Sequence, residues 1–440
     1  MLELLRDMEP EQPMEYVRLL RHGAQVASDT QRQVGRTPAR KSQLPQRVLA
    51  GPRSNLRPAS LFRRALYAEA RGWPRASKSM IDIVSIIASV DAVRRGQATW
   101  GPRPKTGRPV NGLTWSVLNL RQITMVAIPE VDFSSPEAAE QLRRACTDVG
   151  FFYLVHHGIS ADLLAQVYAE MTTFFSQPLE EKRKVLANAA MRGYTPLHEE
   201  TLDPAVQTQG DTKEGFYICR HVPSGSAELQ LPLHGPNVFP AAATFPTFRA
   251  TMETYYAAMC ALGFRVAQLF AQAAGQPGHF DDPGLFDRPM AALRLLHYAA
   301  EKSDVAGGVF GAGAHTDYGL LTLLSTDTTG GLQIRHEGQW VDVPPRADAF
   351  VVNIGDMAER FTNGQFRSTL HRVVNTSGGE RYSVPFFYEP NFTCQVECFP
   401  SCVSAENPAK YPPTTSGQHL VDMYKQTHAS FEASDELHKP

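Results

Sequence analysis

The spacing of apolar and polar positions divides the chain into three parts. Between Gln31 and Arg121 neither a helical nor a strand period is sustained. From residue 125 to about 290, apolar stripes with helical spacing alternate with short apolar runs, and from 291 to 400 short runs separated by turn residues take over. The pattern therefore predicts an extension over 1–124, an N-terminal α/β domain over 125–245, a β-rich domain with a long helix over 246–415, and a C-terminal helix or tail over 416–440.

The α/β domain begins with a short strand in MVAIPEVDF and a buried strand over Phe151 to Gly158. Between them we predict a helix with Ser135 as its N-cap, Pro136 at its first position and Gly150 after its end. Ser160 is the predicted N-cap of a second helix, whose apolar stripe contains Leu164, Val167, Met171 and Phe174. His156 and His157 are adjacent and would point to opposite faces of a strand, so we interpret them as structural.

The strongest predicted helix follows residue 246. Its apolar positions repeat at alternating steps of three and four, and Gly275-Gln276-Pro277 ends it. These positions are Met252, Tyr255, Met259, Leu262, Val266 and Leu269. Such a stripe predicts a helix that packs against the sheet formed by the segments after it.

After this helix come eight apolar runs: LRLLHYAA, LLTLLST, GLQIR, WVDVP, AFVVNIG, HRVVN, RYSVPFFYE and CQVECF. Turn signals separate several of them, including Gly330-Gly331, Glu337-Gly338, Asn363-Gly364 and Gly378-Gly379. Short strands at this spacing predict a sandwich or jelly roll.

Charge separates the extension from the rest of the chain. Residues 1–124 hold 21 Lys and Arg against 9 Asp and Glu, a balance of +12, so the remainder (43 − 21 = 22 against 45 − 9 = 36) carries −14. A basic segment is typical of nucleic-acid binding or organelle targeting, but we favour a disordered extension without a core of its own, with Leu61–Arg71 as a short basic helix. An alternative is that the natural start is Met125.

The cysteines and the apolar runs indicate the cellular compartment in which the protein is expected. Six cysteines form no disulfide framework, and the four-residue spacing of Cys394, Cys398 and Cys402 matches no usual zinc or cluster pattern, so we expect reduced structural thiols. The apolar run from Ile81 to Val90 is interrupted and falls short of the roughly 20 residues that a membrane span needs. We find no signal peptide, and we expect a cytoplasmic protein, with organelle targeting by the extension as the alternative.

Candidate chemistry centres on His315, Asp317 and His371. On an extended strand, residues two apart point to the same face, so His315 and Asp317 could bind one metal ion, and a later strand could supply His371. Two imidazoles and one carboxylate with open positions are typical of non-haem Fe(II) oxygenases.

Arg381 and Ser383 form a second pair two residues apart, in RYSVPFFY. A guanidinium that points into the barrel offers a planar fork for a carboxylate, and a serine on the same face can add a hydrogen bond. We expect the pair to bind a small dicarboxylate whose other end reaches the metal. The alternative is an internal salt bridge.

These motifs, together with GGLQIRHEGQWVDVPP, IPEVDF, GFFYLVHHGI, RGYTP and KEGFY, resemble the 2-oxoglutarate and Fe(II)-dependent dioxygenases of the isopenicillin N synthase-like branch over roughly residues 125–415. The resemblance implies an α+β fold with a mainly β core, a double-stranded β-helix (jelly roll) with a helical N-terminal domain and a long supporting helix. It implies His315, Asp317 and His371 on iron, and Arg381 with Ser383 on the distal carboxylate of 2-oxoglutarate. Tyr298 matches a tyrosine that can reach the co-substrate's other end, although Leu296 stands where the family has asparagine.

The resemblance implies an enzyme that couples decarboxylation of 2-oxoglutarate to succinate and CO2 with O2-dependent oxidation of a small organic substrate. Two alternatives stay open: an oxidase of the same branch that uses no 2-oxoglutarate, and a non-catalytic metal-binding barrel. We expect a monomer with no nucleic-acid or membrane partner. Candidate walls of a partly apolar substrate pocket are Tyr194, Phe216, Tyr318 and Phe387, and the alternative is that these aromatics belong to the core.

Overall fold

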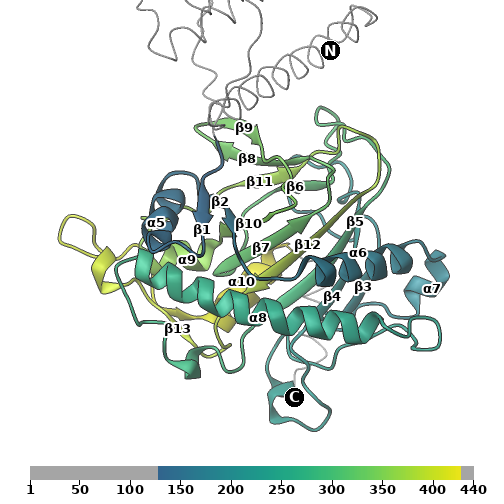
Figure 1. Ribbon diagram of the computed structural model, residues 1–440, viewed down its shortest axis with the longest axis horizontal. Helices are drawn as coiled ribbons and strands as arrows, with labels where there is room; N and C mark the ends of the chain where they lie inside the picture. Colours follow the sequence, from purple (N-terminus) through teal and green to yellow (C-terminus); the bar gives the residue numbers. More distant parts are fainter. Residues whose placement is uncertain (1–126, 428–440) are drawn as a thin grey trace, which may run out of the picture. The chain divides into compact units, whose positions relative to one another are not determined.

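The computed structural model describes residues 127–427. The expectations for residues 1–124, including the short basic helix and the start at Met125, lie outside this range. Within it, two β-sheets face each other and helices cover the larger sheet (Figure 1). None of the helices within 127–427 is long and apolar enough to cross a membrane.

The larger sheet has eight strands, and its outer strands come from the first part of the chain. Strands β1 and β2 form one side, β4 and β3 form the other, and the strands between them come from residues 292–388. In spatial order the strands are β1 (Glu130–Asp132), β2 (Phe151–Val155), β10 (Ala349–Ile354), β7 (Leu321–Thr326), β12 (Arg381–Tyr388), β5 (Ala292–Tyr298), β4 (Lys213–Cys219) and β3 (Gly193–Thr195). Only β1 and β2 pair in parallel; the other neighbouring strands of this sheet are antiparallel.

The smaller sheet has four strands, in the order β6 (Ala312–His315), β11 (His371–Val373), β8 (Leu332–His336) and β9 (Gln339–Asp342). The predicted turn at Glu337-Gly338 joins β8 to β9, and both residues have positive φ. A short pair, β13 (Gln395–Val396) with β14 (Thr414–Thr415), lies outside both sheets. All eight runs predicted as strands after residue 291 form strands, namely β5 and β7 to β13.

The helices follow the predicted apolar stripes. Helix α6 begins after Ser160, whose side chain accepts a hydrogen bond from the N–H of Leu163 (3.5 Å), as predicted. The prediction for the first helix was wrong at its start, because Ser135 caps only the turn before it and Glu137 is the N-cap. Its end is as predicted: Gly150 takes φ +73°, which favours glycine. The helices are α5 (Ala138–Asp148), α6 (Ala161–Phe175), α7 (Leu179–Arg183), α8 (Phe248–Ala273), α9 (Asp356–Phe361) and α10 (Ser416–Thr427), with single turns η1 (Ala227–Gln230), η2 (Pro283–Leu285) and η3 (Pro400–Cys402).

Helix α8 is the predicted long helix, and it runs across the larger sheet beside α5 and α6 (Figure 1). Five of the six predicted core positions are buried, and Leu269 is partly buried against the same cluster. On the face of α8 that packs against the sheet, Gly263 leaves room for the ring of Tyr388, because a β-carbon at this position would overlap that ring. The helix therefore backs the central strands β7 and β12, which carry candidate residues on their other face.

Candidate active site

His315, Asp317 and His371 come together between the two sheets. His315 ends β6 and is paired with His371 on β11, so the two imidazoles face each other with ring centroids 4.3 Å apart. Oδ1 of Asp317 lies 3.8 Å from Nε2 of His315 and 3.7 Å from Nε2 of His371. Asp317 was predicted on the same strand as His315, and this was wrong, because it lies in the loop after β6. The side chains nevertheless converge.

Hydrogen bonds fix which nitrogen of each imidazole faces Asp317. Nδ1 of His315 lies 2.8 Å from the carbonyl of Gly313, and Nδ1 of His371 lies 3.0 Å from the carbonyl of Thr369. A carbonyl oxygen only accepts, so both Nδ1 atoms carry the proton and both Nε2 lone pairs point toward Asp317. Each imidazole thus presents a metal-binding nitrogen to the same point.

Asp317 is held by its second oxygen. Oδ2 accepts hydrogen bonds from Thr322 (2.5 Å) on β7 and Asn353 (2.7 Å) on β10, which leaves Oδ1 free to bind an ion. Burial opposes the charge of Asp317, but the imidazoles of His371 and His315 in their protonated form, together with these two hydrogen bonds, outweigh it and lower the carboxyl pKa. A lowered pKa favours the ionised carboxylate, which is the form that binds a metal ion.

Arg381 lies on β12 and is 1% exposed. Its guanidinium donates to Oγ of Ser383 (3.2 Å) and stacks on the ring of Tyr298 at 4.6 Å, while its Nε has no hydrogen-bond partner. No carboxylate within residues 127–427 forms an ion pair with it, so the predicted alternative of an internal salt bridge finds no partner in the part that the structure describes. A buried cation without an anion is costly, and the site is suited to an anionic ligand.

The donor set fits a divalent transition metal. The ligand atoms of the three residues all lie within 4.8 Å of one another, and no other metal-capable group of His, Cys, Asp and Glu occurs within residues 127–427. Metal–ligand bonds of about 2 Å allow two ligand atoms of one ion to lie up to about 4 Å apart. The distances of 3.8 and 3.7 Å from Oδ1 of Asp317 to the two Nε2 atoms meet this limit. Two neutral nitrogens and one carboxylate on one side fit Fe(II) and leave room for further ligands.

Two cavities meet at this triad. The Arg381 cavity, of about 70 Å³, is lined by Tyr298, Thr322, Asn353, Arg381 and Ser383. The Glu389 cavity, of about 110 Å³, is lined by Arg192, Tyr217, Tyr318, Glu389 and Tyr424. Both cavities share Leu202, Arg294, His315, Asp317 and Phe387 in their walls. An ion bound by the triad would therefore be open to ligands from either side.

Two of the four predicted pocket aromatics line a cavity. Tyr318 and Phe387 belong to the walls of the Glu389 cavity. Tyr194 and Phe216 do not: both are fully buried in the core around Phe174, and the hydroxyl of Tyr194 donates to Glu214 (2.5 Å). For these two residues the prediction as pocket walls was wrong, and the alternative that they belong to the core is confirmed.

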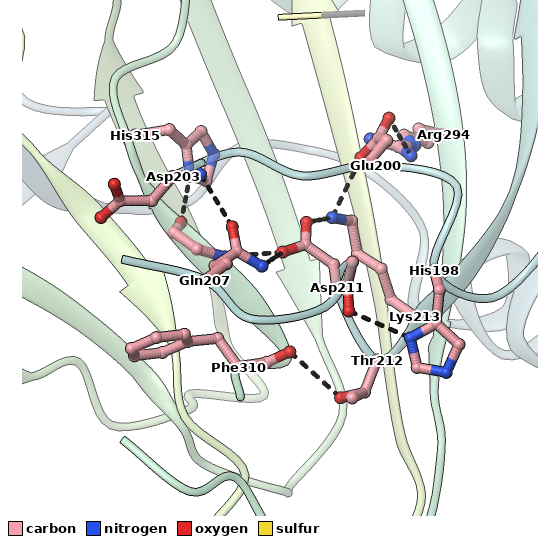
Figure 2. Close-up of polar contacts among 12 residues, drawn as sticks. His198, Glu200, Asp203, Gln207, Asp211, Thr212, Lys213, Arg294, Phe310 and His315 are labelled. Carbon is pink, nitrogen blue, oxygen red and sulfur yellow. Dashed lines mark hydrogen bonds and ion pairs between the residues drawn. The ribbon is translucent and has the colours of Figure 1, made fainter. Parts of the chain in front are cut away.

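A buried row of alternating charges lies close to His315 and contributes to the walls of both cavities (Figure 2). Asp211 pairs with Lys213, Lys213 with Glu200 (3.0 Å), and Glu200 with Arg294 (2.6 Å). Burial opposes the charge of Lys213, but Asp211 and Glu200 outweigh it and raise its pKa. Asp211 also accepts a hydrogen bond from the N–H of Gly313 (2.9 Å), whose carbonyl binds His315. These charged residues thus hold in place strand β6, which carries His315.

The remaining candidates lie away from the triad. His156 is exposed and pairs with Asp132 (2.7 Å), and the half-buried His157 packs edge-on against Phe350. Neither imidazole approaches the triad, in agreement with the prediction that both are structural. All six cysteines are free, also as predicted.

Sequence reasoning missed Thr322, Asn353, Arg192, Glu200 and Glu389. The first two carried a signal that could have been used, because each is a polar residue inside an apolar strand, where a buried side chain needs a partner. The other three depend on loops or strand ends, and nothing in the local pattern marks them.

Family models match this chain in two segments. Residues 128–242 match the N-terminal segment of the non-haem dioxygenase in morphine synthesis, and residues 289–390 match the 2OG-Fe(II) oxygenase superfamily. The second segment contains the triad, Arg381 and Ser383. Together with the relatives below, this shows that the chain belongs to the 2OG-Fe(II) oxygenase superfamily.

The similarity between this chain and its relatives extends over most of the length of each relative. Kihadalactone A synthase LFS of Citrus sinensis is 35% identical over 72% of this chain and 95% of its own length. The 2-oxoglutarate-Fe(II) type oxidoreductase hxnY of Emericella nidulans is 36% identical over 70% and 92%. A full-length Neurospora crassa protein, solved in complex with alpha-KG, superposes with a TM-score of 0.61 at 31% identity over 69% of this chain and 97% of its own.

The chain is therefore an oxidoreductase with a jelly-roll core that uses Fe(II), O2 and 2-oxoglutarate to oxidise a small molecule. Of the alternatives considered, an oxidase without 2-oxoglutarate and a non-catalytic barrel are disfavoured, because the relatives are 2-oxoglutarate-dependent and the solved neighbours bind alpha-KG.

Proposed function

We propose that His315, Asp317 and His371 hold the iron of this dioxygenase, and that the two cavities divide its ligands between them. One observation carries the proposal: the triad and Arg381 line the same cavity, and Arg381 is buried without a carboxylate partner within residues 127–427. Bound iron activates O2 and couples the decarboxylation of 2-oxoglutarate to substrate oxidation.

The Arg381 cavity takes 2-oxoglutarate. Arg381 binds its distal carboxylate in a two-pronged contact, to which Ser383 adds a hydrogen bond, and the other end of the molecule points toward the triad. Tyr298 faces Arg381 across β5 and β12 and packs on its guanidinium, which holds the planar fork in place. We therefore assign Tyr298 first to the orientation of Arg381 and second to the wall of the co-substrate site.

The Glu389 cavity takes the primary substrate. Its walls include His315 and Asp317 but not Arg381, so a substrate carbon there would lie next to the triad. Exclusion of bulk water from this cavity would protect the oxidising step from side reactions. The Neurospora crassa neighbour was also solved with thymine, which supports a substrate of similar, small size.

The test is to incubate the full-length protein with Fe(II) and 2-oxoglutarate and to follow succinate, then to screen small molecules for those that raise its formation. We expect slow succinate formation without a substrate and an increase with a fitting one. An enzyme that oxidises a substrate while forming no succinate would overturn the assignment of the Arg381 cavity.

We further propose the following organisation. Residues 125–245 form a helical N-terminal domain, and residues 246–415 carry the long helix with the jelly roll; the two family matches at 128–242 and 289–390 support this division. The enzyme acts as a monomer on a small molecule, without a nucleic-acid partner, in the cytoplasm. Light scattering of the purified protein tests the oligomeric state.

A further inference from the structure

Glu389 follows directly on β12 and shares the face of Arg381. The residues between them on this face, Ser383, Pro385 and Phe387, all line the Arg381 cavity, and Glu389 continues the series into the other cavity. Its side chain is 4% exposed. It lies against Gly319, where a β-carbon would overlap Oε1. The strand thus carries a buried cation at one end of the site and a buried carboxyl group at the other.

This carboxyl group has no partner among the described residues. Within 127–427 no donor forms a hydrogen bond or ion pair with the Glu389 side chain, although its backbone carbonyl accepts one from Met290 (3.2 Å). Burial, followed by the charge of Asp317, raises its pKa well above the usual range. A buried carboxyl group without a hydrogen-bond partner destabilises the fold, so a structural role alone does not account for Glu389.

Arg192 is a second buried group in the same wall, and it has no carboxylate partner within residues 127–427. It is 4% exposed, and its guanidinium donates only to the backbone carbonyls of Ala190 and Leu233 (2.9 Å for the latter) within the described part of the chain. Its Nε has no partner there, and no carboxylate within 127–427 pairs with it. Burial raises the pKa of the Cys219 thiol, Arg192 opposes this and Glu389 adds to it, so both groups lie near the same thiol.

The other charges around this cavity are compensated. Arg294 is paired with Glu200 (2.6 Å), Arg220 is paired with Glu228 (2.7 Å), and Asp317 accepts its two hydrogen bonds beside the imidazoles. Among the charged residues of the described cavity wall, only Glu389 and Arg192 therefore lack an oppositely charged partner, and they offer one group that accepts from a ligand donor and one that donates to a ligand acceptor. A ligand N–H that donates to Glu389 favours the ionised form of this carboxyl group, and Glu389 and Arg192 then carry no net charge together.

We propose that Glu389 and Arg192 form the recognition pair for the primary substrate, a small molecule with an apolar body whose neutral head presents an N–H to Glu389 and a carbonyl oxygen to Arg192, as in a lactam or cyclic imide. The inference rests on the assignment of the Glu389 cavity to the substrate. An ammonium or a carboxylate alone would leave one of the two groups unmatched, and a zwitterion would lose more hydration on burial.

The test compares matched probes on the full-length protein loaded with Fe(II) and 2-oxoglutarate without oxygen, by titration calorimetry. The probes are uracil with 1,3-dimethyluracil, 2-piperidone with N-methyl-2-piperidone, and phenylalanine as a zwitterion. We expect the N–H members to bind and their N-methyl partners to bind about tenfold to a hundredfold more weakly, because a hydrogen bond to a charged or strongly polar group is lost.

Two variants locate the effect. Glu389→Leu should reduce the preference for N–H over N-methyl to about twofold or less, and Glu389→Gln, which keeps a carbonyl acceptor, should retain part of it. Glu397→Leu replaces an exposed glutamate of the same region and should leave the preference unchanged. Arg192→Leu should weaken the N–H and N-methyl members equally, since both keep the carbonyl.

The inference is overturned if no N–H probe binds, if wild type binds both members of each pair equally, if phenylalanine binds more tightly than the amides, or if Glu389→Leu keeps the preference. The same titration with 2-oxoglutarate separates this failure from that of the proposed function. Normal binding of 2-oxoglutarate without N–H preference would leave the dioxygenase assignment intact, whereas an iron-loaded protein that does not bind 2-oxoglutarate would remove the assignment itself.

Discussion

The two cavities at the triad are built from different kinds of structure. The Arg381 cavity is lined mainly by strand residues, with Tyr298 on β5, Thr322 on β7, Asn353 on β10 and Arg381 on β12. The Glu389 cavity is lined largely by loops, including Arg192 before β3 and the segment from Thr316 to Gly319 after β6. Strands of a twelve-membered pair of sheets (8 + 4) hold side chains in fixed directions, while loops can differ without disturbing the core. Under the proposed assignment, the molecule separates the co-substrate chemistry, which every turnover needs, from the choice of substrate.

The largest effect should come from Asp317, the acidic residue that lines both cavities. Asp317→Ala removes the anionic ligand and leaves two neutral imidazoles, so we expect iron binding to be lost and turnover to fall by more than about 100-fold with the fold retained. Iron content, succinate formation and circular dichroism measure this. Asp342→Ala, at an exposed carboxylate on β9, is the control. Near-normal iron content in Asp317→Ala would refute the ligand assignment.

The next effect should be confined to one cavity. Arg381→Leu removes the fork for the distal carboxylate, and each lost hydrogen bond to a charged group costs about 1.5–3 kcal/mol, so the 2-oxoglutarate concentration at half-maximal rate should rise tenfold or considerably more. Arg381→Lys should fall between wild type and Arg381→Leu, since it keeps the charge without the fork.

The measurement is succinate formation against 2-oxoglutarate concentration, with iron content checked in each protein. Arg335→Leu, which removes an exposed arginine on β8, serves as the control. If 2-oxoglutarate dependence were unchanged in Arg381→Leu, the co-substrate would have to bind in the Glu389 cavity or in both cavities.

A smaller effect should follow from loosening Asp317 rather than removing it. Asn353→Ala deletes one of the two hydrogen bonds to Oδ2, and loss of such a support to a metal ligand costs about 10- to 100-fold in metal affinity. We expect weaker iron binding with an unchanged half-maximal 2-oxoglutarate concentration once iron is saturating. Thr322→Val should act in the same direction. Iron titrations that match wild type for both variants would show that the carboxylate needs neither donor.

The smallest effect should come from the basic extension. A chain that begins at Met125 should fold and keep its succinate formation within about twofold, because the family matches begin at residue 128. An insoluble or inactive product, compared with an active full-length chain, would show that the extension belongs to the catalytic unit.

The difference between the cavities also explains what the sequence could predict. Arg381 and Ser383 could be found because the period of two on a strand fixes which side chains share a face, and the long helix could be found from its apolar stripe. Asp317 could be identified even though it lies beyond β6, since a His-x-Asp spacing converges in a loop as well as on a strand. The sequence could not place Tyr194 and Phe216, because β3 and β4 are buried on both faces, and an aromatic residue on such a strand does not indicate which face borders a cavity. Arg192 and Glu389 are far apart in the sequence, and only the tertiary fold brings them into the wall of the same cavity.

The order of strands in the larger sheet has a consequence for synthesis. Strand β2 ends at Val155, but its partner β10 begins at Ala349, 194 residues later (349 − 155). At a synthesis rate of about 5–20 residues per second, β2 leaves the ribosome about 10–40 s before that partner is available. During this interval the hydrophobic strand Phe151–Val155 has an unpaired edge, which is a template for association with other chains. The nascent protein should therefore depend on chaperones until β10 emerges, and its yield on expression should respond more strongly to temperature and translation rate than to changes around either cavity.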